Sequence, residues 1–330
     1  MLARFTGVTD PGRRRRRNED AYVCEPPLFA IADGMGGAQA GEIASGLAAA
    51  VLEEATGDEP SDQQGEERVA SLIQEANRRV FQRSNEDAAT SGMGTTMTVA
   101  LVDNSAGTIA FGHVGDSRAY RVRGGELEQL TDDHSLVGEL VRSGRLSPEE
   151  AESHPQRSVI TRALGTEPDV DVDTFTVEAE RDDIYLLCSD GLTDMISASE
   201  ILGVVEASGD LEDAARALVN AANAGGGEDN ITVVLFQIDG HGSDSDAGET
   251  ARMPAAVTPE PEDDEDTLSP LDAVPAVDTA VIPAAVIEQH LQQAELEPQE
   301  REPRRRILPL VALVLLLLVL VLLAVWGLSR

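Results

Sequence analysis

Residues 28–37, LFAIADGMGG, place Asp33 at the end of a short apolar stretch and directly before a glycine. The apolar residues 28–32 predict a buried strand. A carboxylate at such a strand end opposes folding unless it has a partner. Because similar polar clusters flank other apolar stretches, we expect these strand ends to meet at one place. The clusters are Arg15-Arg16-Arg17-Asn18-Glu19-Asp20, Gly115-Asp116-Ser117-Arg118, Ser189-Asp190-Gly191 and Gly226-Gly227-Glu228-Asp229-Asn230.

Converging carboxylates beside glycines predict a site for hard divalent cations. Oxygen ligands suit Mg²⁺ or Mn²⁺, and the sequence has no His/Cys spacing typical of zinc. Two ions about 3.5–4 Å apart that share Asp33 would polarise a phosphoryl group and lower the pKa of a bridging water. Each Asp-Gly pair alone is a common turn, so the prediction of a metal-dependent hydrolase depends on the whole set.

The spacing of apolar residues and turns in the rest of the chain predicts an α+β fold of two packed, mainly antiparallel β-sheets flanked by helices. Neighbouring strands joined by short turns, such as those around Gly124-Gly125, argue against a doubly wound parallel sheet. Helices are predicted where apolar residues recur with a period near 3.6 residues. The predicted strands are 28–32, 95–102, 108–114, 119–122, 126–130, 183–188 and 231–238, and the predicted helices are 41–52, about 69–80 and 211–223.

A polar segment, about 131–165, interrupts this pattern and predicts a flap beside the site. It is expected to form short helical pieces at 133–143 and 147–152, and it contains His134 and His154. A structural role is favoured for both histidines.

The composition excludes some classes of protein. The chain has 330 residues, a formal net charge of −35 and no lysine. Basic residues cluster only at 13–17 and 304–306, so no nucleic-acid partner is expected. Cys24 and Cys188 lie in apolar stretches and are expected to be free thiols in a reducing compartment.

Residues 240–330 differ in character from residues 1–239, which we predict to be the catalytic domain. Residues 240–306 are acidic and proline-rich and predict a disordered linker. Residues 307–328 are a 22-residue apolar run, about 33 Å long as a helix, which predicts a C-terminal transmembrane helix in the lipid bilayer. The arginines at 304–306 predict a single-pass plasma-membrane protein with a cytoplasmic catalytic domain.

Residues 5–239 resemble a bacterial phosphatase of the metal-dependent 2C (PPM) family. The resemblance rests on motifs in family order, and as a set they are specific. They are the clusters quoted above together with Asp33-Gly34-Met35-Gly36-Gly37, Gly94-Thr95-Thr96 and His154-Pro155-Gln156-Arg157-Ser158.

The resemblance implies a role for each matching residue. Asp33 would bridge two metal ions, and Gly34 would add its carbonyl. Asp190 and Asp229 would hold the first ion, and Glu19 would act on the second through water. Asp116 would join Asp190 at a weaker third ion. Arg15 would bind the substrate phosphate, to which its guanidinium fork is suited.

Two departures from the family pattern bear on these roles. Arg15 lies in a run of five arginines, residues 13–17, so Arg14 or Arg16 could share its role, or the run could be solvated surface charge. Met35 stands where eukaryotic members have a histidine proposed as general acid, so the proton for the leaving group needs another donor.

The expected function is hydrolysis of phosphoserine and phosphothreonine in phosphorylated proteins, opposing a membrane Ser/Thr kinase and acting on its substrates. A membrane-tethered, non-catalytic adaptor that binds phosphoproteins is the alternative. Loss of a metal ligand would indicate the adaptor, and no expected carboxylate is missing. A phosphatase dedicated to an anti-sigma regulator would share the chemistry and differ in substrate.

Overall fold

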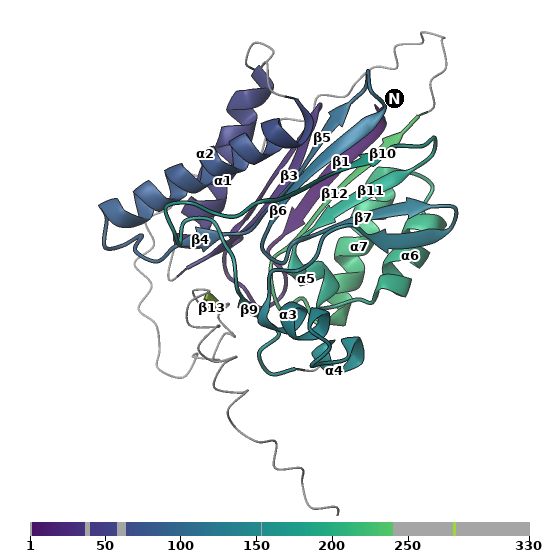
Figure 1. The fold of residues 1–330 in the computed structure, drawn as a ribbon. Coiled ribbons are helices and arrows are strands. Elements are labelled where there is room, and N and C mark those ends of the chain that lie inside the picture. Colours follow the sequence, from purple (N-terminus) through teal and green to yellow (C-terminus); the bar gives the residue numbers. More distant parts are fainter. Residues whose placement is uncertain (1, 37–39, 58–63, 153, 240–279, 282–330) are drawn as a thin grey trace, which may run out of the picture. The chain divides into compact units, whose positions relative to one another are not determined.

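Two antiparallel sheets lie face to face between pairs of helices (Figure 1). The computed structural model describes residues 2–36, 40–57, 64–152, 154–239 and 280–281. The first sheet has the order β1 (Leu2–Asp10), β12 (Ile231–Ile238), β11 (Ile184–Cys188), β7 (Arg118–Arg123) and β8 (Glu126–Gln129). The second has the order β10 (Asp173–Glu178), β6 (Thr108–Val114), β5 (Met97–Asp103), β3 (Leu28–Met35) and β2 (Asp20–Glu25), and β4 (Gly94–Thr95) also pairs with β3.

Aromatic side chains fill the space between the two sheets. Phe29 of β3 stacks on Phe236 of β12 with ring centroids 4.4 Å apart, and Tyr185 of β11 stacks on Phe236 at 5.1 Å. The central strands are apolar almost throughout because helices also cover their outer faces. Burial on both faces therefore explains the continuous apolar runs in the sequence.

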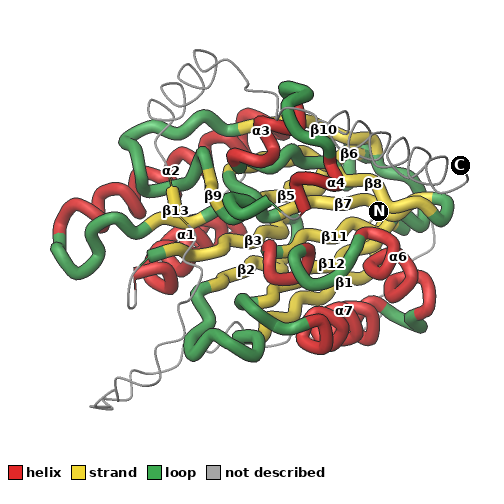
Figure 2. The backbone as a smooth tube through the Cα atoms, turned by 90° about the horizontal axis from the view of Figure 1, so that it is seen from below, coloured by secondary structure: helices red, strands yellow, loops and turns green. Residues whose placement is uncertain are grey.

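Helices α1 (Ala40–Gly57) and α2 (Gly65–Glu86) pack on the second sheet, whereas α6 (Ala198–Ala207) and α7 (Leu211–Gly225) pack on the first. Figure 2 shows the two pairs on opposite sides. Gly112 of β6 permits close approach of α2, because a Cβ atom there would lie only 2.7 Å from Ile73 Cδ1. This packing makes a four-layer α/β/β/α sandwich.

The flap contains α3 (Leu136–Arg142), α4 (Pro148–Glu152) and β9 (Val159–Ile160). Ser135 caps α3 by accepting a hydrogen bond from the Gly138 N–H at 3.1 Å. The short strand β9 pairs in parallel with β13 (Ala280–Val281). In Figure 1, α3 and α4 lie at the lower end of the sheets, near α5 (Asp190–Thr193).

The sandwich confirms the predicted α+β class and the antiparallel pairing. The hairpin β7–β8 turns through Gly124 and Gly125, with φ of +60° and +81°, as a two-residue turn of type I′ requires. One prediction is corrected: the strand expected at 95–102 divides into β4 and β5 at Thr96, whose N–H donates to the Asp33 carbonyl at 2.9 Å instead. Strands β1, β2 and β10 and helix α6 were not predicted.

The predicted linker at 240–306 and the predicted transmembrane helix at 307–328 lie outside the described residues, apart from the two residues of β13. No helix in the described part of the chain has the length and apolar character needed to cross a membrane.

Candidate metal centre and phosphate site

The predicted acidic residues lie at the same end of the two sheets. Asp33 is near the end of β3, and the antiparallel register pairs it with Asp20 at the start of β2. Asp190 follows β11, Asp229 precedes β12, and Asp116 lies in the turn from β6 to β7. In antiparallel sheets the end of one strand lies beside the start of the next, which is why these distant clusters meet.

Asp33 is at the centre of the acidic group. Burial raises the pKa of its carboxyl well above the ordinary value, and neighbouring carboxylates raise it further. These neighbours are Asp20, Asp190, Asp229 and Asp116. Burial and carboxylate neighbours also raise the pKa of Asp190, and burial raises that of Asp116 to about 7. Like charges held this close favour either protonation or a cation.

The donors of this acidic group fit a hard divalent cation. Among the described residues, none forms a hydrogen bond with the buried atoms Asp20 Oδ1, Asp116 Oδ1 and Asp190 Oδ1. Carboxylate oxygens of this kind are the ligands that Mg²⁺ and Mn²⁺ prefer. Within the described residues, no three His, Cys, Asp or Glu side chains form a preassembled cage for one ion. Repulsion between the carboxylates opposes such a close approach.

The motif Gly94-Thr95-Thr96 fixes the backbone of Asp33. Thr95 Oγ1 donates to the Asp33 carbonyl at 2.8 Å, and the Asp33 N–H donates to Thr96 Oγ1 at 3.0 Å. The Thr96 hydroxyl also lies 2.8 Å from Ser117 Oγ, in the turn that carries Asp116. Two predicted metal ligands from different strands are thereby tied together.

Asp20 belongs to the site, although sequence analysis gave it no role. Its Oδ2 accepts hydrogen bonds from Ser189 Oγ at 2.9 Å and Thr232 Oγ1 at 2.5 Å. Burial raises the pKa of Asp20 to about 6, although these two hydrogen bonds oppose the rise. No local signal marks Asp20, because its place in the site depends on the register between β2 and β3.

Asp194 is a second residue that the sequence analysis missed. Burial raises the pKa of its carboxyl, and the nearby Asp229 adds to the effect. Arg157 of the flap lies against it, with Nε 3.4 Å from Asp194 Oδ2. The spacing of four residues from Asp190, across the single turn of α5, could have indicated it.

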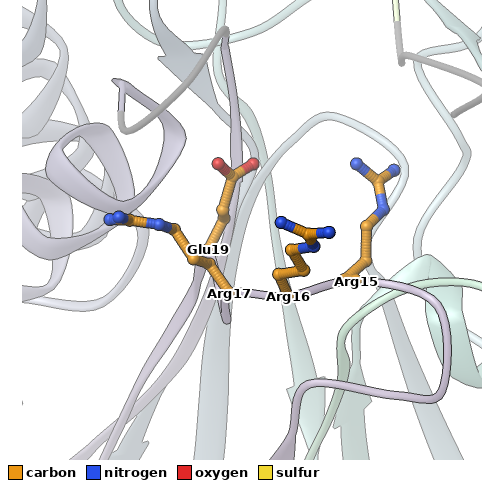
Figure 3. A pocket seen from close by; sticks show the side chains of 4 residues that line it. All are labelled: Arg15, Arg16, Arg17 and Glu19. Atoms are coloured by element: carbon orange, nitrogen blue, oxygen red, sulfur yellow. The ribbon is translucent and has the colours of Figure 1, made fainter. Parts of the chain in front are cut away.

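Arg15 lies beside the acidic group. Its Nη2 is 2.7 Å from Asp229 Oδ2, so the predicted phosphate-binding residue contacts a predicted metal ligand. Arg14 pairs with Glu228 at 3.0 Å, and Arg17 lies 3.8 Å from Glu42. Figure 3 shows Arg15, Arg16, Arg17 and Glu19 lining one pocket.

Glu19 and Gly34 lie together at the start of α1. The Gly34 N–H donates to the Glu19 carbonyl at 3.1 Å. A Cβ atom on Gly41 would lie 2.7 Å from Glu19 Oε2 and 2.8 Å from the Gly34 carbonyl oxygen, so a glycine is needed there. Burial raises the pKa of Glu19, and Arg15 opposes the rise.

Asn230 holds the loop that carries Arg15 and Glu19. Its Oδ1 accepts from the Glu19 N–H at 2.8 Å, and its Nδ2 donates to the carbonyls of Pro11 at 3.1 Å and Arg17 at 2.8 Å. The loop also rests on Gly227, whose carbonyl accepts from the Arg13 N–H at 2.7 Å. The arginine loop, residues 11–19, is therefore fixed against the turn before β12.

His134, His154 and Met35 have structural contacts. His134 is buried, with Nδ1 accepting from the Gly115 N–H at 3.0 Å and Nε2 3.1 Å from Asp173 Oδ2. Met35 packs in a small apolar cluster with Ile160 and Ala163. His154 accepts the Gln156 N–H within its own turn at 3.2 Å. Cys24 and Cys188 are free, as predicted.

Comparisons with known proteins agree with this geometry. A family model described as protein phosphatase 2C matches residues 13–224. The serine/threonine phosphatase stp of Listeria welshimeri is 42% identical over 237 residues, which are 69% of this chain and 93% of that protein. The crystal structure of the Mycobacterium tuberculosis serine/threonine phosphatase PstP/Ppp is 39% identical with a TM-score of 0.69, and the match covers 73% of this chain and 100% of that one.

A further solved structure contains the metal ions that the acidic group predicts. It is the catalytic domain of the serine/threonine protein phosphatase PstP in complex with two manganese ions. That structure is 37% identical with a TM-score of 0.66, and the match covers 72% of this chain and 99% of that one. This chain belongs to the protein phosphatase 2C family. It is a metal-dependent protein serine/threonine phosphatase of the bacterial type, as the sequence predicted.

Proposed function

We propose that this phosphatase removes phosphate from serine and threonine side chains of proteins at the cytoplasmic face of the plasma membrane, opposing a membrane Ser/Thr kinase. The main support for the phosphatase activity is the buried group of carboxylates around Asp33, which lies next to Arg15. Some of its oxygens have no hydrogen-bond partner among the described residues. An anionic cluster of this kind binds divalent cations, and an adjacent guanidinium suits a phosphate.

The proposed ligands are those that the family resemblance implies, and the carboxylates of Asp33, Asp190, Asp229 and Asp116 lie close enough to interact. Asp33 would be shared by two Mn²⁺ or Mg²⁺ ions, with Asp190 and Asp229 on the first. Glu19 and the Gly34 carbonyl, which lie together, would serve the second. Asp116 with Asp190 would hold a weaker third ion. When bound, the ions supply an activated water and neutralise charge on the phosphoryl group.

Arg15 would bind and orient the phosphate of the substrate. Its ion pair with Asp229 holds the guanidinium next to the metal ligands before substrate arrives. Two N–H groups of the fork can then donate to phosphate oxygens, which fixes the phosphorus relative to the carboxylates. The hydrogen bonds of Asn230 to the loop hold the backbone at Arg15 and Glu19 in a fixed position relative to the acidic group.

The membrane location is supported by the sequence alone. The apolar run at 307–328 is long enough for a single span, and arginines precede it at 304–306. A tethered phosphatase would act at a raised effective concentration on phosphoproteins at the same membrane. A kinase and its substrates on that surface are the partners that fit this arrangement.

The activity is tested with a phosphothreonine peptide and Mn²⁺. We expect Asp33→Asn and Asp229→Asn to lower kcat/KM by about 100-fold or more, because each removes a charge that holds an ion. Asp169→Asn, at an exposed residue distant in sequence from the acidic clusters, is the matched control and should keep wild-type activity. Circular dichroism would check that each variant is folded. Full activity in a folded Asp33→Asn protein would overturn the metal assignment.

A further inference from the structure

Arg16 stands out among the residues of the pocket beside Arg15. The pocket has a volume of about 250 Å³ and is lined by Arg15, Arg16, Arg17 and Glu19. Arg15 is paired with Asp229, and Arg17 lies near Glu42. Arg16 is exposed, and no described residue forms a hydrogen bond or an ion pair with its side chain. Its charge is therefore available to a ligand, in a chain whose net charge is −35.

The position of Arg16 relative to Arg15 is fixed by the backbone. Both residues lie in the arginine loop, which Asn230 and Gly227 hold from both ends. Figure 3 shows the Arg15 and Arg16 side chains rising from the same side of this loop, whereas Arg17 is turned away from them. The two guanidinium groups therefore face the same pocket.

We propose that Arg16 selects phosphopeptides with an acidic or phosphorylated side chain one or two residues from the phosphoresidue. This inference rests on the proposed function, in which Arg15 holds the reacting phosphate. Adjacent residues have Cα atoms 3.8 Å apart, and an extended peptide advances about 3.3–3.6 Å per residue. A group that reaches Arg16 while the phosphate is on Arg15 must therefore be a close neighbour on the same peptide.

The charge of Arg16 also favours an acidic side chain next to the phosphoresidue of the substrate. The protein as a whole repels anionic peptides, since its net charge is −35. Arg16, which lines the pocket and has no ion-pair partner within the described part of the chain, offsets this repulsion locally. Its guanidinium can donate two hydrogen bonds to a carboxylate or phosphate. Substrates that bring such a group would bind better than neutral ones with the same phosphothreonine.

The test compares three phosphothreonine peptides of equal length: one with alanine on both sides, one with glutamate at the flanking positions, and one with a second phosphothreonine. kcat/KM is measured with Mn²⁺ for the wild type, Arg16→Gln and Arg78→Gln. Arg78 is an exposed arginine on α2 that pairs with Glu75, so its substitution makes the same charge change elsewhere.

We expect the wild type and Arg78→Gln to prefer the acidic peptides over the alanine peptide by about five- to tenfold, and the preference to fall as salt rises. In Arg16→Gln the preference should fall below about twofold. The proposal would be overturned if the wild type had equal kcat/KM on all three peptides, or if Arg16→Gln kept the wild-type preference for the acidic peptides. An equal loss on all three peptides would instead assign Arg16 to the reacting phosphate and overturn the selective role. Failure of every protein to hydrolyse any peptide would refute the proposed function itself.

Discussion

Buried carboxylates around Asp33 repel one another in the folded protein, so each of them lowers stability when no cation is bound. Asp20 is one of these carboxylates: its pKa rises to about 6, and its Oδ1 has no hydrogen-bond partner among the described residues. Its Oδ2 is also the acceptor for Ser189 and Thr232. The residue therefore combines a favourable hydrogen-bonding role with an unfavourable charge.

Replacing Asp20 by asparagine should separate these two roles. In the presence of a chelator at pH 7.5, we expect Asp20→Asn to raise the free energy of unfolding by about 1–2 kcal/mol, because the amide oxygen keeps the hydroxyl donors and the charge is lost. The apparent affinity for Mn²⁺ should fall about tenfold, since the residue supports the ligands. Urea unfolding and Mn²⁺ titration of activity measure the two effects. Asp169→Asn should change neither quantity, and a chelated Asp20→Asn protein less stable than wild type would contradict the argument.

His113 makes the fold sensitive to acid. It is fully buried, with Nδ1 2.9 Å from Thr98 Oγ1 and Nε2 3.2 Å from the Asp132 carbonyl, contacts that suit the neutral ring. Burial lowers the pKa of His113 to about 3. The unfolded chain takes up this proton near pH 6.5 and the folded chain does not, so stability is lost as pH falls from about 6.5 towards 3.

The contribution of His113 to the pH dependence of stability can be measured by comparing the wild type with His113→Gln. Between pH 7 and pH 5 the His113 contribution should cost the wild type about 2 kcal/mol of unfolding free energy, at about 1.4 kcal/mol per pH unit below pH 6.5. His113→Gln should lack this part of the pH dependence, whatever its stability at pH 7. His154→Gln is the control and should keep it. Urea unfolding of the chelated proteins at both pH values gives the comparison, and parallel curves for wild type and His113→Gln would refute it.

At the scale of elements, the arginine loop depends on one side chain. Asn230 is 4% exposed and makes hydrogen bonds to the backbone at Pro11, Arg17 and Glu19. We expect Asn230→Ala to lower the free energy of unfolding by about 1–3 kcal/mol, because backbone groups lose their partners. It should also raise KM for a phosphopeptide, since Arg15 is no longer held.

Trypsin provides a direct measure of the loop, because it cleaves after arginine. The arginine loop in Asn230→Ala should be cut at least several times faster than in the wild type, as the backbone there opens more often. Asn85→Ala, at the exposed end of α2 where Asn85 donates to Phe81, is the control. Unchanged cleavage in Asn230→Ala would contradict this role of Asn230 and show that the other contacts of the loop, such as those of Gly227 and Asp10, are enough to fix it.

The sequence predicted the interior strands better than the peripheral ones. β6 and β12 have their predicted bounds, because burial on both faces produces an uninterrupted apolar run. β1 and β10 lie at sheet edges, and their residues are largely exposed or half-buried. Such strands lack the long apolar runs of the interior strands, and the short alternation of Phe175 and Val177 in β10 was not recognised.

Some residues of the site were predicted from the sequence and others were not. Asp33, Asp116, Asp190 and Asp229 are marked by glycines at strand ends, and the structure brings these carboxylates together. The role of Asp20 in the site depends on the register between β2 and β3. The role of Asn230 depends on its hydrogen bonds to a loop more than 200 residues away in the sequence. Neither relation is visible in local sequence, because only the folded pairing creates it.

At the scale of the whole molecule, the proposed anchor predicts where the protein is found. Ending the chain after residue 300 should move it from the membrane fraction to the soluble fraction, because the apolar run is removed. Its kcat/KM on a soluble phosphopeptide should stay within about twofold of the full chain. Sedimentation of cell extracts and a peptide assay measure both outcomes.

A full-length control keeps the chain and changes only its apolar character. Placing two arginines in the run, Leu316→Arg with Leu317→Arg, should weaken insertion by about 2.5–3.5 kcal/mol for each charge and release the protein as truncation does. Truncated protein that still sediments with membranes would place the anchor elsewhere.

The order of strands also bears on how copies of this protein behave at high concentration. Each sheet ends in strands with unpaired backbone groups, and such an edge can recruit a strand from another molecule. One edge strand of each sheet carries exposed acidic residues: Glu126 and Glu128 on β8, and Asp173 and Glu178 on β10. When two of these edges approach each other, like charges come together, so these edges resist the edge-to-edge growth that leads to aggregation.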